Sequence, residues 1–282
     1  MGFEEIDVYT SELQFRCLSI GSGPLILCLH GFPDTPHSFK PLMEELAKKG
    51  YRVVAPFMRG YAPTGFPQDG DFSILSLGWD VIHIMDALAV EKAIVVGHDW
   101  GATAAYTAAI LEPSRIEKMV TAAVPHLRTV KPGLKQVLLS WYIVFFQIPY
   151  LPEFIMRLKN FAFIDYLYQR WSPYGKHWDL SNIKSVLKKP FAVRALLSYY
   201  RSLLRLKRGQ WSTIFRKISV PSLVIAGEVD QSIGIELFEG YEEGFDGACQ
   251  LVQMKSAGHF MHIEQAQDFV RHVLDFIDEA DA

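Results

Sequence analysis

Two patterns of apolar and polar positions divide this chain of 282 residues. Between residues 13 and 123, short apolar runs alternate with stretches in which apolar residues recur at helical spacing. The run LILCL at 25–29 is apolar throughout, which is typical of a strand buried on both faces of a parallel sheet. The alternation stops over 127–216 and resumes at residue 221. We therefore predict parallel strands and crossover helices, interrupted by a helical insertion.

The same patterns give the order of elements. The N-terminal segments IDVYT and LQFRCLSI alternate as an antiparallel edge hairpin does. Further strands are expected at 25–29, 51–56, 93–96, 118–124, 221–227 and 250–254. Helices are expected near 38–50, 73–88, 102–110, 233–240 and 266–278. Together these elements predict an α/β fold with a mostly parallel eight-stranded sheet, in which residues 1–126 and 217–282 form the core.

The insertion at 127–216 is rich in aromatic residues and leucine at helical spacings, with prolines as breakers. We interpret it as a helical cap, or lid, over the α/β core. Its most apolar stretch, VLLSWYIVFF at 137–146, predicts one helix whose apolar face covers another part of the protein. A membrane helix needs about 18 or more apolar residues, so no membrane span is expected.

Charge and cysteine content narrow the partners and the compartment. The formal net charge of -3 gives no basic excess, so we do not expect nucleic acid as a partner. The three cysteines, Cys17, Cys28 and Cys249, lie far apart in the sequence, which favours a reducing compartment. The N-terminus has acidic residues where a signal peptide has basic ones, so a cytoplasmic location is expected. The sequence does not indicate the oligomeric state.

The stretch GHDWGA at 97–102 carries the predicted chemistry. It joins an apolar strand to a helix of small residues, and predicts a sharp turn that holds the side chain of Asp99 above the sheet. Gly97 and Gly101 suit this turn, because it leaves no room for neighbouring side chains. The backbone N–H of Trp100, at the helix start, is one expected donor of an oxyanion hole. Asp99 is thus the predicted nucleophile.

An acid and a histidine follow later strands, in the chain order that such a turn requires. Asp230, in GEVD, is the expected acid, with Glu228 as the alternative. His259, in SAGHF, is the expected base, whereas His262 is expected to be a neutral histidine at a helix start. The spacing of the two histidines comes without a recognisable third ligand, so no metal site is expected.

The loop HGFPDTPHSF at 30–39 follows the first buried strand. The backbone N–H of Phe32 is expected to be the second oxyanion-hole donor, and a cis peptide bond is expected before Pro33. His30 is expected to hold the shape of the loop. His98, at the variable position of the GHDWGA turn, is given no role.

A carboxylate nucleophile indicates reaction at a saturated carbon. A serine attacking such a carbon would form an ether, which water and a histidine cannot cleave, whereas Asp99 would form an ester that water can cleave. The substrate is therefore expected to be an epoxide or an alkyl halide. His259 would activate the water, and Asp230 would hold the required tautomer of the imidazole.

The motifs HGFP, RGYAPTG, GHDWGA, GEVD and SAGHF, with a helical insertion after the sixth strand, resemble those of the α/β-hydrolase-fold epoxide hydrolases. The resemblance covers nearly the whole chain. It implies hydrolysis of a small apolar epoxide to a vicinal diol, with an Asp nucleophile, a His–Asp pair, water as co-substrate and no cofactor. The motif RGYAPTG differs from that family, whose members often have RGYG followed by a small polar residue. This difference is expected to affect the rim of the pocket rather than catalysis.

The resemblance also implies two cap tyrosines that donate hydrogen bonds to the epoxide oxygen. In WYIVFFQIP this residue is Tyr142, and in SYYRSLLR it is Tyr200, with Tyr199 as the alternative. Adjacent helical residues point about 100° apart, so only one of the latter two faces the site. The residues expected to contact the substrate are Phe32, Trp100, Trp141 and Phe146, and the cap aromatic residues Phe145, Trp171 and Trp178 also suggest an apolar pocket.

Three other functions are consistent with parts of the sequence. Haloalkane dehalogenases also have an Asp nucleophile, and Trp100 would suit a halide, but they typically read HGNP where this chain has Phe32. Haloacetate dehalogenases carry their acid after the sixth strand, where AAVPHL has no carboxylate. A non-catalytic ligand receptor often loses a member of the triad, whereas this chain has a complete set.

Overall fold

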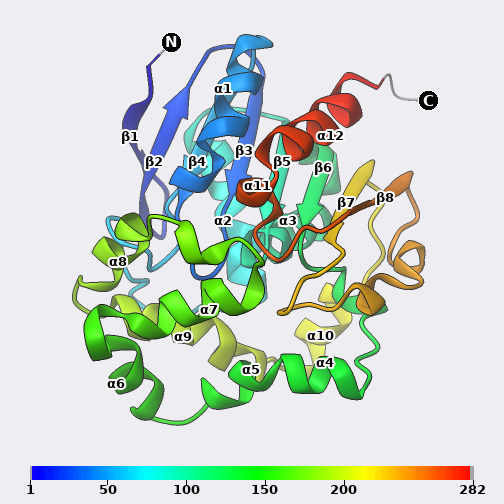
Figure 1. Cartoon of the computed structure of the whole chain (residues 1–282). Helices are drawn as coiled ribbons and strands as arrows, with labels where there is room; N and C mark the ends of the chain where they lie inside the picture. The colour runs from blue at the N-terminus through cyan, green and yellow to red at the C-terminus, as the bar shows by residue number, and fades with distance from the viewer. Residues whose placement is uncertain (1, 280–282) are drawn as a thin grey trace.

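Eight strands form one sheet in the order β1-β2-β4-β3-β5-β6-β7-β8, in a computed structural model that describes residues 2–279 (Figure 1). The strands are β1 (Glu4–Tyr9), β2 (Gln14–Ile20), β3 (Leu25–Leu29), β4 (Arg52–Pro56), β5 (Ala93–His98), β6 (Ile116–Ala122), β7 (Ser222–Gly227) and β8 (Cys249–Met254). β2 pairs antiparallel with both β1 and β4, and the other pairings between these strands are parallel. The predicted mostly parallel sheet with an edge hairpin is confirmed.

Helices of the core cover both faces of this sheet. They are α1 (Lys40–Lys48), α2 (Ile74–Ala87), α3 (Trp100–Leu111), α11 (Met261–Glu264) and α12 (Ala266–Asp278). One apolar core joins the sheet to α2 and α3, and a second joins it to α1 and α12. Within β3, Leu27 faces the first core, whereas Ile26 and Cys28 face the second. A strand covered on both sides has no polar face, which explains the uninterrupted apolar run.

The helices of the cap fall between β6 and β7, and Figure 1 shows them gathered below the sheet. They are α4 (Leu134–Leu139), α5 (Trp141–Phe145), α6 (Leu151–Arg157), α7 (Ala162–Trp171), α8 (Ser181–Leu187), α9 (Ala192–Leu203) and α10 (Arg208–Ile214). The cap is tied to the core by hydrogen bonds. Tyr168 Oη donates to the carbonyl of Pro33 at 2.9 Å, and the His259 N–H donates to the carbonyl of Trp171 at 2.9 Å. All of these helices lie inside 127–216, and the independence of this segment as a domain stays a prediction.

The apolar stretch at 137–146 differs from its prediction as one covering helix. It is divided at Ser140, where the backbone (φ -83°, ψ 13°) leaves the α-helical region between α4 and α5. Several of its apolar side chains face solvent: Leu138 is 67% exposed and Val144 72%. The break lets successive short helices turn different side chains inward, so less of the stretch is buried than predicted.

The helix predicted near 233–240 is also absent as an α-helix. The chain forms a short 3₁₀ turn at Ile235–Phe238, followed by a second at Tyr241–Gly244. Gly240 separates them with φ of 68°, a left-handed conformation that ends a right-handed helix and suits glycine.

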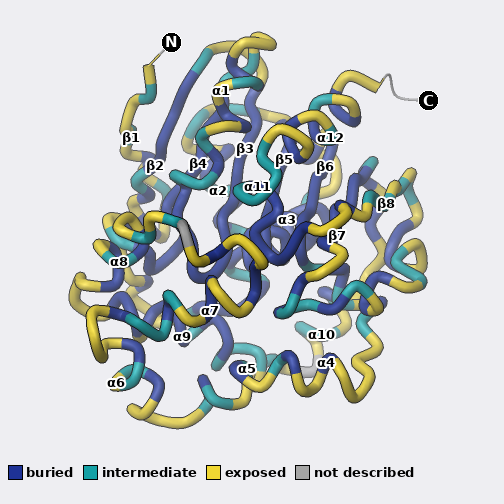
Figure 2. The backbone as a smooth tube through the Cα atoms, viewed as in Figure 1, coloured by how far each residue is buried: buried dark blue, intermediate teal, exposed yellow. Residues whose placement is uncertain are grey.

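Burial is concentrated in the central strands, which are dark blue in Figure 2. Every residue of β3, β5 and β7 is buried. Polar groups at the ends of these strands therefore sit on a rigid, well-packed base. Among residues 2–279, no helix combines the length and the apolar character needed to cross a membrane.

Candidate active site

Asp99 occupies a strained turn between the last residue of β5 and the first residue of α3. Its φ of 53° and ψ of -116° lie outside the regions that a non-glycine residue ordinarily adopts. A side chain at Gly101 would collide with the carbonyl of Leu29, and one at Gly97 with the carbonyl of Gly101. The two glycines thus allow β5, α3 and the end of β3 to approach closely. This packing holds the Asp99 carboxylate at the edge of the sheet.

The two oxygens of the Asp99 carboxylate have different surroundings. Oδ1 accepts a hydrogen bond of 2.7 Å from the backbone N–H of Phe32, which the sequence predicted as an oxyanion-hole donor. Oδ2 lies 3.6 Å from His259 Nε2. Trp100 is the first residue of α3, so its N–H belongs to the helix terminus beside Asp99. The peptide bond between Phe32 and Pro33 is cis, as predicted.

His259 and Asp230 come together behind the nucleophile. His259 Nδ1 donates to Asp230 Oδ2 at 2.8 Å, and both side chains are buried. The other oxygen of Asp230 accepts the N–H groups of Ser232 at 2.6 Å and Ile233 at 3.0 Å, which hold the carboxylate in place. Glu228, the alternative acid, instead accepts the N–H of Ser256. The structure therefore brings Asp99, His259 and Asp230 into one group.

His259 lies between the carboxylates of Asp230 and Asp99, which favour its charged form. Burial by itself lowers the pKa of His259, but the charge and hydrogen bond of Asp230, followed by Asp99, outweigh it and raise this pKa to about 10. At neutral pH His259 is thus an imidazolium in the resting protein. Loss of either carboxylate charge would lower its pKa.

A cavity of about 380 Å³ opens in front of Asp99. Its walls are mainly apolar and come from both core and cap. Tyr142 from α5 and Tyr200 from α9 line it together with Asp99 and Trp100. Tyr142 Oη shares a hydrogen bond of 3.1 Å with Ser232 Oγ. The cavity thus presents one carboxylate and two phenols in mainly apolar surroundings.

The two phenols keep their protons. Burial raises the pKa of Tyr142, and the Asp99 charge raises it further. The same two causes hold the pKa of Tyr200 well above its usual value. A protonated phenol is a hydrogen-bond donor, so both groups suit an oxygen that becomes negative near Asp99.

The structure also distinguishes the two adjacent tyrosines. Tyr199 Oη donates to the carbonyl of Arg59 at 2.7 Å, so this side chain points into the core. Tyr200 lines the cavity, and its ring packs 5.2 Å from that of Trp100. The alternative left open by the sequence is therefore settled in geometry, and Tyr200 faces the cavity.

Three of the residues expected at the substrate differ in position. Phe32 and Phe146 are not among the cavity-lining residues but pack on the ring of Tyr200 at 5.3 and 5.0 Å, and thus support the wall. Trp141, which was expected to contact the substrate, does not line the cavity. It is 38% exposed and packs on Phe145 at 5.9 Å, because Tyr142 takes the inward direction on α5.

Two residues beside the site were not among the predicted site residues. Ser232 contacts Tyr142, and its only sequence signal is its place two residues after Asp230. Trp171, expected only as one of several cap aromatic residues, packs edge-on at 5.2 Å to His259 and accepts the N–H of His259 at its carbonyl. Contacts of this kind join distant segments, so a local pattern does not show them.

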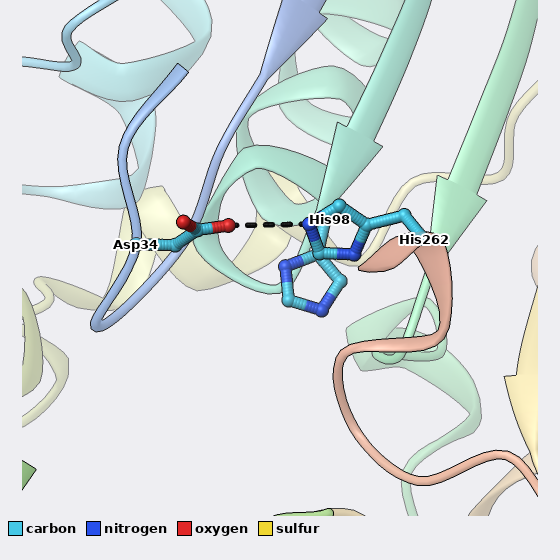
Figure 3. A group of neighbouring side chains, drawn as sticks. All are labelled: Asp34, His98 and His262. Atoms are coloured by element: carbon cyan, nitrogen blue, oxygen red, sulfur yellow. Dashed lines mark hydrogen bonds and ion pairs between the residues drawn. The ribbon is translucent and has the colours of Figure 1, made fainter. Parts of the chain in front are cut away.

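Three other histidines in or near the predicted motifs make contacts that explain their positions. His30 shapes its loop as expected, since its Nε2 accepts the N–H of Met58 at 3.1 Å. His262 lies in the short helix α11 and pairs with Asp34 at 3.2 Å. His98, which was given no role, lies beside this pair, and one ligand atom of each of the three residues lies within 4.8 Å of the others (Figure 3).

Comparisons with known proteins agree with this architecture. The AB hydrolase superfamily protein YfhM from Bacillus subtilis is 32% identical over 89% of this chain and 85% of its own length. Epoxide hydrolase 4 from Homo sapiens is 28% identical over 97% of this chain and 78% of its own length. A mutant of the epoxide hydrolase from Solanum tuberosum, 26% identical, has a TM-score of 0.81 over 98% of this chain and 99% of that chain.

The family model of the α/β hydrolase fold matches residues 24–266. The match begins just before β3, the first strand buried on both faces, and ends at the start of α12. It therefore includes the strained turn, the acid, the histidine and the whole helical insertion. This chain belongs to the α/β hydrolase fold family.

Proposed function

We propose that this protein hydrolyses small apolar epoxides to vicinal diols through an ester formed on Asp99. One observation carries the proposal: two protonated phenols and one carboxylate line the same apolar cavity. A carboxylate can attack an epoxide carbon, and the phenols can donate to the oxygen that this attack releases. Relatives named epoxide hydrolases, over nearly the whole chain, support the choice of substrate.

In the first step, Asp99 Oδ2 forms a bond to one ring carbon, and the bond from that carbon to the ring oxygen breaks. The ring oxygen becomes an alkoxide, accepts hydrogen bonds from Tyr142 and Tyr200, and takes a proton from one of them. Asp99 Oδ1 stays with the N–H of Phe32 and becomes the carbonyl oxygen of the ester. This step needs no base, because the nucleophile is already ionised.

In the second step, His259 takes a proton from a water that attacks the ester carbon of Asp99. Ester formation removes the charge of Asp99, so the pKa of His259 falls. The imidazolium can then return a proton to the phenolate left by the first step, and the neutral imidazole accepts the proton of the water. The negative charge then develops on Asp99 Oδ1, beside the N–H of Phe32. Cleavage releases the diol and restores the carboxylate. The proton taken from water restores the resting imidazolium, so both His259 and the phenol end in their starting states.

Substitution of His259 by Gln separates the two steps. The epoxide should still open, because attack by Asp99 needs no base, but hydrolysis should stop, because the water has no proton acceptor. We expect intact-mass analysis to show the protein plus one whole epoxide, and peptide mapping to place this mass on the segment with Asp99. His272→Gln on α12, away from the cavity, is the matched control and should turn over without an adduct.

A His259→Gln protein that is folded and inactive but carries no adduct would show that His259 acts before ring opening, and the ester mechanism would be wrong. A panel of substrates tests the other functions. Haloalkane turnover without epoxide turnover would favour a dehalogenase, for which Trp100 in the cavity is the supporting observation. Absence of turnover on all of them would favour a ligand receptor.

A further inference from the structure

Three buried side chains meet beside the catalytic group, and each comes from a different segment (Figure 3). Asp34 lies in the loop after β3, His98 is the last residue of β5, and His262 belongs to α11. Their exposed fractions are 5%, 0% and 3%. None of the three is among the residues that line the substrate cavity. The mechanism proposed above uses none of these side chains.

His98 carries a nitrogen lone pair that has no partner among the described residues. Its Nε2 lies 2.8 Å from the carbonyl of His259, and a carbonyl only accepts, so Nε2 holds the proton. In a neutral imidazole that carries its proton on Nε2, Nδ1 is an acceptor, and here it is buried without a hydrogen-bond partner among the described residues. A buried acceptor left in this state is unfavourable, which points to a group that binds it.

The surroundings match those of a metal-binding histidine. Metal-ligating histidines usually donate their other N–H to a carbonyl or a carboxylate, as His98 does to the carbonyl of His259. Asp34 Oδ1 accepts the N–H of Thr35 at 2.7 Å, which orients the carboxylate. Asp34 Oδ2 and His262 Nε2 form a contact of 3.2 Å, and one ligand atom of each of the three residues lies within 4.8 Å of the others.

We propose that Asp34, His98 and His262 form a buried site for a divalent metal ion of borderline softness, such as Zn²⁺. The ligands are Asp34 Oδ2, His98 Nδ1 and His262 Nε2. The remaining proton of His262 is on Nδ1, which has no hydrogen-bond partner among the described residues. Two imidazoles and one carboxylate are a common set for such an ion, and water can supply a fourth ligand. The sequence did not predict this metal site. His259 and His262 lie close together in the sequence, whereas the three proposed ligands come from separate segments.

The site lies beside a second hollow that shares no lining residue with the substrate cavity. Asp34 forms part of the wall of this hollow, of about 290 Å³, on the protein surface. Thr35, His37, Ser38 and Asp179 also line it and give it polar character. We expect an ion to enter from this hollow rather than through the substrate cavity.

The ion would join three parts of the catalytic framework. It would connect the loop that carries Phe32, the turn that carries Asp99 and the segment that carries His259. His98 would hold the carbonyl of His259 while its other nitrogen binds the metal. Because the ion binds only the folded arrangement, it should raise the melting temperature.

The test begins with metal-free protein titrated with Zn²⁺ by calorimetry and with Co²⁺ as a spectroscopic probe. We expect one ion per chain, visible d–d absorption from Co²⁺ and a higher melting temperature. Asp34→Asn and His262→Gln should each weaken binding by at least about tenfold. His37→Gln, which alters the hollow but not the ligand set, is the matched control and should bind normally. His259→Gln should also bind normally.

Anomalous diffraction from wild-type crystals grown with Zn²⁺ locates the ion even if a variant fails to fold. The expected position is between Asp34, His98 and His262. The proposal is wrong if the wild type binds no stoichiometric ion, or if only a water molecule occupies the position. It is equally wrong if binding survives in both ligand variants or is lost in His259→Gln, since the ion would then sit elsewhere. These readouts do not depend on turnover, so they are independent of the proposed reaction.

Discussion

The two halves of the catalytic cavity are built by different means. On the core side, Asp99, Asp230 and His259 follow β5, β7 and β8, and the hydrogen-bonded strands set their separations. On the cap side, Tyr142 and Tyr200 come from α5 and α9, and α5 is only five residues long. These tyrosines are held mainly by aromatic packing, such as the 5.0 Å contact between Phe146 and Tyr200. In the proposed reaction, the core half positions the bond-forming groups, whereas the cap half supplies the hydrogen-bond donors and the shape of the cavity.

We therefore expect substitutions in the two halves to impair the reaction in different ways. Removal of a core group should stop one chemical step, because each core group has a role that the others do not share. Removal of a cap group should slow a step without stopping it, because the second phenol remains. Changes on the outer surface of the cap should have almost no effect on chemistry.

The largest effect is expected for Asp99→Asn. A neutral amide cannot form the ester, so turnover should fall by roughly 10⁴-fold or more. The measurement is steady-state diol formation with freshly prepared protein in which the amide at position 99 has been verified by mass. Slow return of activity on storage would reflect deamidation back to aspartate. Full activity in verified fresh protein would exclude Asp99 as the nucleophile.

The next largest effect is expected for the cap phenols. Tyr142→Phe and Tyr200→Phe should each slow alkylation of Asp99 by roughly 10²-fold, and the double variant by much more. The measurement is single-turnover ester formation. Tyr199→Phe is the matched control, because its hydroxyl contacts the carbonyl of Arg59 instead of the cavity, and its alkylation rate should stay near that of the wild type. Equal losses in all three variants would mean that packing, rather than hydrogen-bond donation, explains the effect.

A smaller effect is expected from pH. Hydrolysis of the ester needs neutral His259, so its rate should rise with pH by up to about tenfold per unit and then level off. Levelling should occur below pH 10, because the resting pKa of about 10 includes the charge of Asp99, which the ester lacks. Rapid-quench measurement of the second step between pH 6 and 10 checks this. A rate that falls as pH rises would contradict the role of His259 as base.

The smallest effect is expected for Trp141→Ala. The side chain is 38% exposed and does not line the cavity, so the alkylation rate and KM should remain within about twofold of wild type. Phe146→Ala is the informative comparison, because its buried ring supports Tyr200 and should be needed for the donor geometry. A large loss of activity in Trp141→Ala alone would mean that the cap surface takes part in substrate binding.

The sequence by itself determined the strands, the turn at Asp99 and the positions of Asp230 and His259. Each of these depends on residues close together in the chain: an apolar run, glycines that allow tight packing, and a polar residue just after a strand. Parallel strands then bring their ends to one edge, which is why separate motifs could be joined into one predicted site. The helical insertion could also be predicted from the sequence, because its apolar spacing is a local property of the chain.

Which side chains of the cap face inward depends on how the cap helices pack on the core, and no local pattern predicts it. Tyr199 and Tyr200 are equivalent in a local pattern, and the contact of Tyr199 with Arg59 separates them. The sequence predicted that Trp141 contacts the substrate. The break at Ser140 and the inward position of Tyr142 instead turn its side chain towards solvent. The meeting of Asp34, His98 and His262 was equally hidden, because contacts between three distant segments follow from how strands and loops pack, and no local spacing records them.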